Sequence, residues 1–131
     1  MTQFELLSDP ETLIAVVGAT DTPGKYGGII YRDLRGRGHR VAAVNPNRTT
    51  VAGDPCVPNL RSLPETPDIV NLVVPPSVGK TVIDEWESLG GTSVWFQPGS
   101  YDDRVVAQAK QAGMDVVEGD CIMVLSRRLA V

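Results

Sequence analysis

The chain has 131 residues, 42% of them hydrophobic and 21% charged, which suits one globular domain with a substantial buried core. Its formal net charge is −4 at pH 7, and this acidic balance argues against a nucleic acid or an anionic membrane surface as its partner. No apolar run approaches the roughly 18–20 residues that a membrane-spanning helix needs. From the length of the chain we expect a single domain over residues 1–131.

The first part of the chain predicts a strand, a helix and a second strand. The run Thr12–Ala19 is continuously apolar, which is typical of a strand that is buried on both faces. Apolar residues then recur at helical spacing, and the segment Arg35–Gly38 ends this helix. The inward positions of the helix are Tyr26, Ile29, Ile30 and Leu34. The second strand is Arg40–Val44, and the residues 45–55 that follow it are rich in turn formers.

Three more strands are predicted further along the chain. Leu60 and Leu63 indicate a short helix, which Pro64 closes. The three strands are Asp68–Val74, Thr92–Gln97 and Asp115–Gly119.

Two helices lie between these three strands. Ser77 can cap the first helix, whose inward residues are Val78, Val82, Ile83, Trp86 and Leu89. Ser100 can cap the second helix, and Gly113 ends it. Its inward residues are Val105, Val106, Ala109 and Ala112. The apolar segment Cys121–Leu125 favours β-structure, and we expect either a last short strand or a packed tail there.

This alternation of strands and helices predicts an α/β fold, with a mainly parallel sheet of five or six strands between two layers of helices. In such sheets a ligand lies at the carboxyl ends of the strands. Proline and glycine dominate these ends and give rigid turns that a ligand can approach closely. Five such turns at one edge of the sheet predict a binding cleft there: GATDTPGKYGG, NPNR, VPPS, QPGS and EGDC.

The loop after the first strand, VVGATDTPGKYGG, is close to a phosphate-binding loop. Five residues separate Gly18 from the pair Gly24 and Lys25, and Tyr26 follows, whereas the ATP- or GTP-binding loop has four and then Ser or Thr for magnesium. Thr20 stands where the dinucleotide motif has its second glycine. The loop opens a helix, whose free N–H groups attract phosphate. With two threonine hydroxyls and one lysine, it predicts a diphosphate site without a magnesium ligand.

The end of the second strand bears on which nucleotide could bind. An NAD-binding fold usually has Asp or Glu there, about 20 residues past the glycine turn, to bind the ribose hydroxyls. The sequence VNPNR has no acid at this place and instead offers Arg48. A cation suits a phosphorylated ribose. NADP, which carries a 2′-phosphate, and coenzyme A, which carries a 3′-phosphate, therefore both remain possible ligands.

These segments, taken in order, resemble a known family. VVGATDTPGKYGG, VAAVNPN, VNLVVPP, VWFQPGS and VVEGDCIMV are similar to segments of the small bacterial and archaeal CoA-binding proteins, which are stand-alone relatives of the N-terminal domain of succinyl-CoA synthetase α subunits. The resemblance extends from Leu13 to Leu125 and rests on the order and spacing of the segments. It implies a Rossmann-like domain that holds CoA across the carboxyl ends of the strands.

The resemblance also implies which residues contact each part of CoA. The diphosphate would be surrounded by Gly18, Ala19, Thr20, Lys25 and Tyr26. The 3′-phosphoribose would lie near Asn45, Pro46, Asn47 and Arg48. The adenine and ribose side would be lined by Val74, Pro75 and Pro76. The pantetheine arm would lie along Gln97, Pro98 and Gly99, with Cys121 near its end as a candidate for a mixed disulfide with the CoA thiol.

One position departs from the family pattern. Family members often have lysine after the proline that follows the second strand, whereas this chain has Asn47 and then Arg48. The residue that takes the 3′-phosphate is therefore open.

The sequence predicts no catalytic residues. In the synthetase, a phosphorylated histidine and a nucleotide-grasp subunit carry out the chemistry, and both lie outside the matching domain. The single histidine here, His39, precedes the second strand and so lies at the edge opposite the predicted cleft. The acid pairs Asp84/Glu85 and Asp102/Asp103 fall on or beside helices, where solvated or first-turn charges are expected.

A metal site and a secreted location are not expected. Cys56 and Cys121 are far apart, and with one histidine they predict no metal site. The N-terminal residues MTQFELLSDPE carry acids where a signal peptide needs basic residues. We expect a cytoplasmic protein with reduced thiols.

The sequence therefore predicts a non-enzymatic domain that binds CoA or an acyl-CoA, and a homodimer is the default for so small a domain. Two alternatives remain. One is an NADP- or nucleotide-binding domain of the oxidoreductase type, and the other is a regulatory or interaction subunit that senses CoA.

Overall fold

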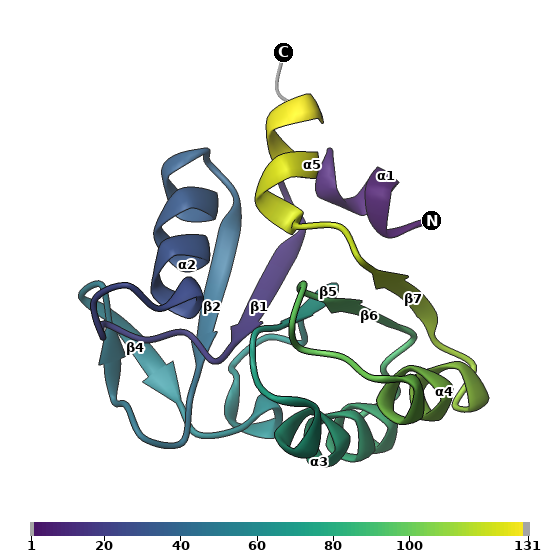
Figure 1. Ribbon diagram of the computed structural model, residues 1–131. Helices are drawn as coiled ribbons and strands as arrows, with labels where there is room; N and C mark the ends of the chain where they lie inside the picture. Colours follow the sequence, from purple (N-terminus) through teal and green to yellow (C-terminus); the bar gives the residue numbers. More distant parts are fainter. Residues whose placement is uncertain (1, 130–131) are drawn as a thin grey trace.

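The computed structural model describes residues 2–129, and Figure 1 shows a central sheet with helices on both sides. The strands are β1 (Leu13–Val17), β2 (Arg40–Val44), β3 (Thr50–Val51), β4 (Asp54–Val57), β5 (Ile69–Leu72), β6 (Ser93–Phe96) and β7 (Asp115–Glu118). The helices are α1 (Gln3–Leu7), α2 (Tyr26–Gly36), the single 3₁₀ turn η1 (Leu60–Ser62), α3 (Pro76–Ser88), α4 (Asp103–Gln111) and α5 (Ile122–Leu129). The sheet order is β3-β4-β2-β1-β5-β6-β7. All neighbouring strands are parallel except β3 and β4, which confirms the predicted α/β class.

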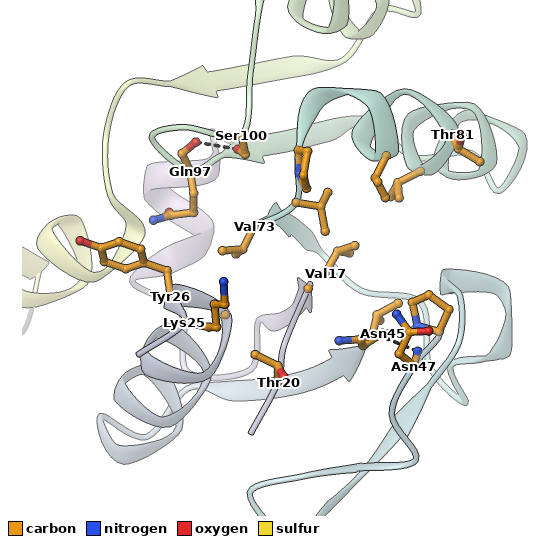
Figure 2. A pocket seen from close by; sticks show the side chains of 18 of the residues that line it. Val17, Thr20, Lys25, Tyr26, Asn45, Asn47, Val73, Thr81, Gln97 and Ser100 are labelled. Carbon is orange, nitrogen blue, oxygen red and sulfur yellow. Dashed lines mark hydrogen bonds between the residues drawn. The ribbon is translucent and has the colours of Figure 1, made fainter. Parts of the chain in front are cut away.

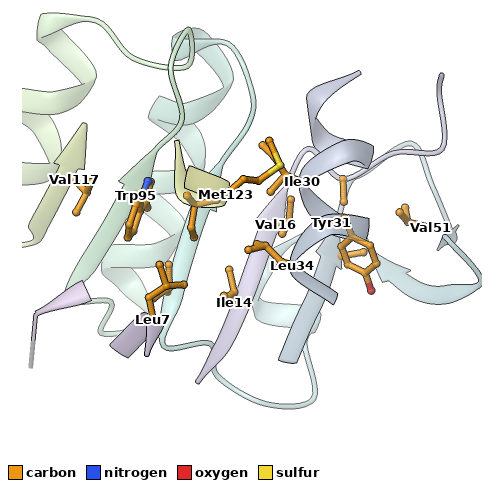
Figure 3. Close-up of a cluster of buried hydrophobic side chains, with 14 of the residues drawn as sticks. Leu7, Ile14, Val16, Ile30, Tyr31, Leu34, Val51, Trp95, Val117 and Met123 are labelled. Carbon is orange, nitrogen blue, oxygen red and sulfur yellow. The ribbon is translucent and has the colours of Figure 1, made fainter. Parts of the chain in front are cut away.

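Strand β1 lies at the centre of the sheet and explains the two helical layers. All five of its residues are buried. Ile14 and Val16 pack in a core cluster with residues of α1, α2 and α5, which Figure 3 shows. Ala15 and Val17 point the other way and join a second cluster with α3 and α4. Because successive side chains of a strand face opposite sides, a strand between two helical layers must be apolar at every position.

Helix α2 turns a different face to the sheet from the predicted one. Its buried large side chains are Ile30, Tyr31 and Leu34. The predicted inward residues Tyr26 and Ile29 are 66% and 45% exposed, so their assignment to the core was wrong. Helix α3 shows the same error at its ends, where Val78 and Leu89 are exposed while Ile83 and Trp86 are buried. End residues of a helix project beyond the sheet that its middle covers.

The sheet has seven strands rather than the five or six predicted, because a hairpin begins within the turn-rich residues that follow β2. Strands β3 and β4 are joined by Ala52 and Gly53, both with positive φ, at 52° and 82°. Positive φ at both residues is the geometry of the tight turns that suit the twist of paired strands. Strand β3 has only two residues and β4 contains Pro55, so neither shows the usual pattern of a strand.

The two ends of the described chain form helices that the sequence prediction missed. The segment Cys121–Leu125 was expected to be a strand or a packed tail, but residues Ile122–Leu129 form α5. Ile122, Met123 and Ser126 are buried, on one face that packs beside α2 (Figure 1). Packing of an amphipathic face thus overrides the β-propensity of the segment. At the other end, Thr2 caps α1 by accepting from the backbone N–H of Glu5, and the Thr-x-x-Glu spacing is a capping signal.

The N-cap residues of α3 and α4 are not the serines that the sequence predicted. Helix α3 begins two residues earlier than a Ser77 cap implies, at Pro76, with Pro75 as its N-cap. Helix α4 is capped by Asp102, whose Oδ1 accepts from Val105 N at 2.9 Å, while Ser100 donates to the carbonyl of Gln97. None of the helices within residues 2–129 is both long enough and apolar enough to cross a membrane.

Candidate functional site

The loop between β1 and α2 is folded tightly against the helix that follows it, and three glycines permit this. Gly18 has a φ of 102°, a conformation that side chains disfavour, and a Cβ there would overlap the Val73 carbonyl oxygen. A Cβ on Gly27 would overlap the Gly18 carbonyl oxygen, and one on Gly28 would overlap that of Thr20. The glycine pair at the start of α2 therefore lets the helix approach the loop at backbone distance.

The amino end of α2 is equipped to hold an anion. Lys25 is the N-cap residue, and no side chain caps the helix. The first N–H groups of a helix have no partner within it, and the helix dipole adds partial positive charge there. Thr20, Thr22 and Lys25 border the same space, adding two hydroxyls and an ammonium group. Donors of this kind at a helix N-terminus form a binding site for phosphate.

This space is part of a cavity of about 1300 Å³ at the carboxyl ends of β1, β2, β5 and β6. Figure 2 shows side chains of all four strand ends around it, with the ammonium of Lys25 directed toward its centre. Of the residues that the sequence assigned to the site, all except Ala19 and Arg48 line the cavity. The strand ends thus meet in one place, as expected for a parallel sheet.

Ala19 and Arg48 do not belong to this lining, but each contacts a residue that does. The side chain of Ala19 is fully buried in the core, and its carbonyl oxygen accepts from Asn45 Nδ2 at 2.9 Å. Arg48 reaches across to the β1–α2 loop, where its Nη2 donates to Thr22 Oγ1 at 2.8 Å. Both residues therefore connect the end of β2 with the loop after β1.

The end of β2 carries no carboxylate. Asn45 occupies the first position after the strand, and its Oδ1 accepts from the backbone N–H of Asn47 at 2.9 Å. The acid of the β1–α2 loop, Asp21, forms an ion pair with Arg32 at 2.6 Å and accepts from the backbone N–H of Ala52 at 2.9 Å. Among the described residues that line the cavity, Glu85 is the one carboxylate.

Gln97 organises the far corner of the cavity, where β6 ends and α5 begins. Its Oε1 accepts from Asn71 Nδ2 at 3.1 Å and from the backbone N–H of Ile122 at 2.8 Å. Its Nε2 donates to Cys121 Sγ at 3.3 Å. These partners fix the orientation of the Gln97 side-chain amide. Cys121 is the cysteine whose thiol lines the cavity. Cys56 is buried, which raises the pKa of its thiol, and it does not belong to the lining.

Comparison with known proteins adds to this geometry. A family model described as a CoA binding domain matches residues 12–127, nearly the whole chain. The chain belongs to this CoA-binding domain family.

Relatives of this CoA-binding domain include both large ligases and small proteins. The ADP-forming acetate–CoA ligase I of Archaeoglobus fulgidus is 26% identical over 129 residues, which cover 91% of the chain but only 19% of the ligase. The uncharacterized protein YneT of Bacillus subtilis is 26% identical over 111 residues, covering 85% of this chain and 82% of YneT. The chain therefore spans about a fifth of the ligase but most of YneT.

Two solved structures similar to the CoA-binding domain are of its own size. A conserved hypothetical protein of Pyrococcus furiosus is 41% identical with a TM-score of 0.83, over 86% of this chain and 97% of that one. A Thermus thermophilus protein is 32% identical with a TM-score of 0.85, over 97% and 96% of the two chains. These likenesses confirm the Rossmann-like fold.

One wall of the cavity was missed by the sequence analysis. It is built by η1 and the adjoining face of α3, and its residues are Pro58, Asn59, Leu60, Arg61, Val78, Thr81, Val82 and Glu85. Glu85 was interpreted as a solvated charge, but only 15% of its side chain is exposed. Its Oε1 accepts from Leu60 N at 3.0 Å and its Oε2 from Arg61 Nε at 2.9 Å. The spacing of the α3 residues, three or four apart, was the available signal for a common face.

His39 lies away from this cavity, as the sequence predicted. Its Nε2 is 2.7 Å from Ser126 Oγ on α5, in a small separate hollow beside Leu7 and Arg37. Burial lowers the pKa of His39, and the charge of Arg37 adds to this effect. Trp86 and Trp95 are core residues, as expected. No cluster of three or more metal-binding side chains occurs in the part of the chain that the structure describes.

Proposed function

We propose that the chain binds coenzyme A, either free or acylated, in the cavity at the carboxyl ends of β1, β2, β5 and β6. The observation that carries this proposal is the uncapped amino end of α2, which opens with Thr20, Thr22 and Lys25 onto the cavity. Backbone N–H groups, hydroxyls and an ammonium group all donate hydrogen bonds, and charge-assisted donors of this kind suit a diphosphate.

The form of the cavity supports a long ligand with a central diphosphate. From the α2 end the lining continues one way to Asn45, Asn47 and η1, and the other way to Gln97 and Cys121. Its volume of about 1300 Å³ exceeds the roughly 300–1,000 Å³ of ordinary small-molecule pockets. CoA has a nucleoside on one side of its diphosphate and the pantetheine arm on the other, so it can use both directions.

The end of β2 favours CoA over NAD. A dinucleotide site of the usual kind needs a carboxylate to bind the adenosine ribose hydroxyls. Asn45 stands there instead, and both polar atoms of its side chain are engaged by Ala19 and Asn47. A carboxylate would also repel a phosphorylated ribose, which CoA carries. Membership of the CoA-binding domain family supports the same choice.

We assign binding rather than catalysis to this domain. The carboxylate of the cavity, Glu85, has both oxygens occupied by Leu60 and Arg61, and His39 is remote. Such an arrangement gives no paired acid and base beside the diphosphate site. The activity of the ligases is not carried over, because the chain matches only 19% of the Archaeoglobus enzyme.

Native mass spectrometry tests the assignment. The purified chain is mixed with equal concentrations of CoA, NADP, NAD and ATP with magnesium. We expect the protein to appear mainly with the added mass of one CoA. A spectrum dominated by NADP or NAD would instead support an oxidoreductase-type domain.

A further inference from the structure

Arg48 and Thr22 join two loops at the edge of the cavity. Arg48 follows β2, and its backbone N–H donates to the carbonyl of Asn45, which fixes the turn. Its Nη2 donates to Thr22 Oγ1 at 2.8 Å, in the loop before α2. Thr22 lines the cavity, whereas Arg48 does not. The guanidinium therefore contacts a residue of the anion site without itself lining the cavity.

The hydrogen bonds around Thr22 determine where its hydroxyl proton can go. A hydroxyl has one proton to donate and two lone pairs that accept. Thr22 Oγ1 accepts from Arg48, which can only donate, and also from Thr20 Oγ1 at 3.2 Å. Thr20 Oγ1 in turn accepts from the backbone N–H of Thr22 at 3.2 Å. Because Arg48 can only donate, Thr22 must accept from it, and the hydroxyl proton of Thr22 can then be donated to an anion in the cavity.

The charge of Arg48 strengthens the same donor. A hydroxyl that accepts a hydrogen bond from a cation is polarised and donates more strongly. The nearby negative charge of Asp21 is paired with Arg32 at 2.6 Å, and this ion pair offsets it. Arg48 thus adds positive potential to the anion site without belonging to its lining.

We propose that Arg48 is a positioning residue for the diphosphate site, acting through the hydroxyl of Thr22 rather than by contact with the 3′-phosphate. This inference rests on the proposed binding of CoA and names how one part of that site is oriented. It makes Thr22 the residue that donates to a diphosphate oxygen, and it explains why a loop threonine and an arginine 26 positions later form one unit.

Dissociation constants for CoA and for dephospho-CoA, which lacks the 3′-phosphate, test the proposal. The variants are Arg48→Ala, Thr22→Val, Thr22→Ser and the double variant Arg48→Ala with Thr22→Val. Arg104→Ala on α4, which removes an exposed arginine outside the cavity lining, is the matched control for loss of one charge. Thermal unfolding of each variant establishes that the fold is retained.

We expect Arg48→Ala and Thr22→Val each to weaken both ligands on the order of tenfold and to similar extents. The double variant should bind no more than slightly worse than either single variant, because the two residues act through one hydroxyl. Thr22→Ser should retain wild-type affinity, since it keeps that hydroxyl.

Three results would overturn the proposal while leaving CoA binding in place. They are a loss with Arg48→Ala that is confined to CoA, an additive double variant, and no loss with Arg48→Ala. A wild-type protein that binds neither ligand would instead contradict the proposed function and this inference together.

Discussion

The Nε2 of Gln97 donates a hydrogen bond to the sulfur of Cys121 across 3.3 Å, at the junction of β6 and α5. The same side chain accepts from Asn71 and from the first N–H of α5, so its amide is held between the sheet and the helix. Cys121 is therefore presented at the cavity wall in a fixed position and is only partly buried.

This position predicts how the two thiols react. A small alkylating reagent should modify Cys121 and leave buried Cys56 unmodified in the folded protein, because reaction needs an accessible thiolate. Bound CoA should slow modification of Cys121 by occupying the cavity. Peptide mass spectrometry measures both rates, and Cys121→Ser controls for the site. Faster labelling of Cys56, or no protection by saturating CoA, would remove Cys121 from the ligand site.

Gly27 and Gly36, at the two ends of α2, should respond in opposite ways to alanine. A Cβ on Gly27 meets the Gly18 carbonyl oxygen, whereas one on Gly36 meets nothing within 4 Å. We expect Gly27→Ala to lower the free energy of unfolding by about 1–3 kcal/mol through overpacking. Gly36→Ala should raise it by about 0.4–1 kcal/mol, because alanine restricts the unfolded chain. Urea titration measures both, and equal effects would contradict the tight fit of the loop on α2.

Lys25 should act on the part of the ligand that CoA and dephospho-CoA share. Its ammonium borders the uncapped end of α2, where the diphosphate is proposed to lie. Lys25→Ala should weaken both ligands by about tenfold, as expected for loss of a charged hydrogen-bond donor. Equilibrium titrations at one ionic strength measure the two losses. A loss for CoA alone would assign Lys25 to the 3′-phosphate instead.

His39 should make the folded protein less stable in mild acid. Burial lowers its pKa below the ordinary 6.5, so the unfolded chain binds the proton more readily than the folded one. Stability that is complete above pH 6.5 is therefore lost as the pH falls below it. Between pH 8 and pH 5.5, His39→Gln should lose less thermal stability than the wild type. The carboxylates titrate in both proteins, so an identical loss would contradict a depressed pKa.

Features with a local cause were predictable from the sequence. The buried strand β1 follows from an unbroken apolar run, and the cavity edge follows from the prolines and glycines at the strand ends. Long-range features were not predictable in this way. The inward face of α2 is decided by the contacts of Gly27 and Gly28, and the burial of Glu85 depends on how α3 meets η1.

Two further elements were missed because their local signals were weak or contrary. The hairpin of β3 and β4 has a two-residue strand and a proline in its partner. Helix α5 has β-prone residues that become helical when Ile122 and Met123 are buried against the sheet and α2. The contact between Arg48 and Thr22 depends on two loops meeting, which spacing along the chain does not encode.

Isothermal titration calorimetry of the purified chain with CoA, NAD, NADP and ATP with magnesium tests the central claim most directly. The uncapped end of α2, the absence of a carboxylate in the Asn45 turn after β2, and the length of the cavity together predict that CoA binds with the lowest dissociation constant. NAD or NADP binding as tightly as CoA, or no heat on addition of CoA to folded protein, would contradict it.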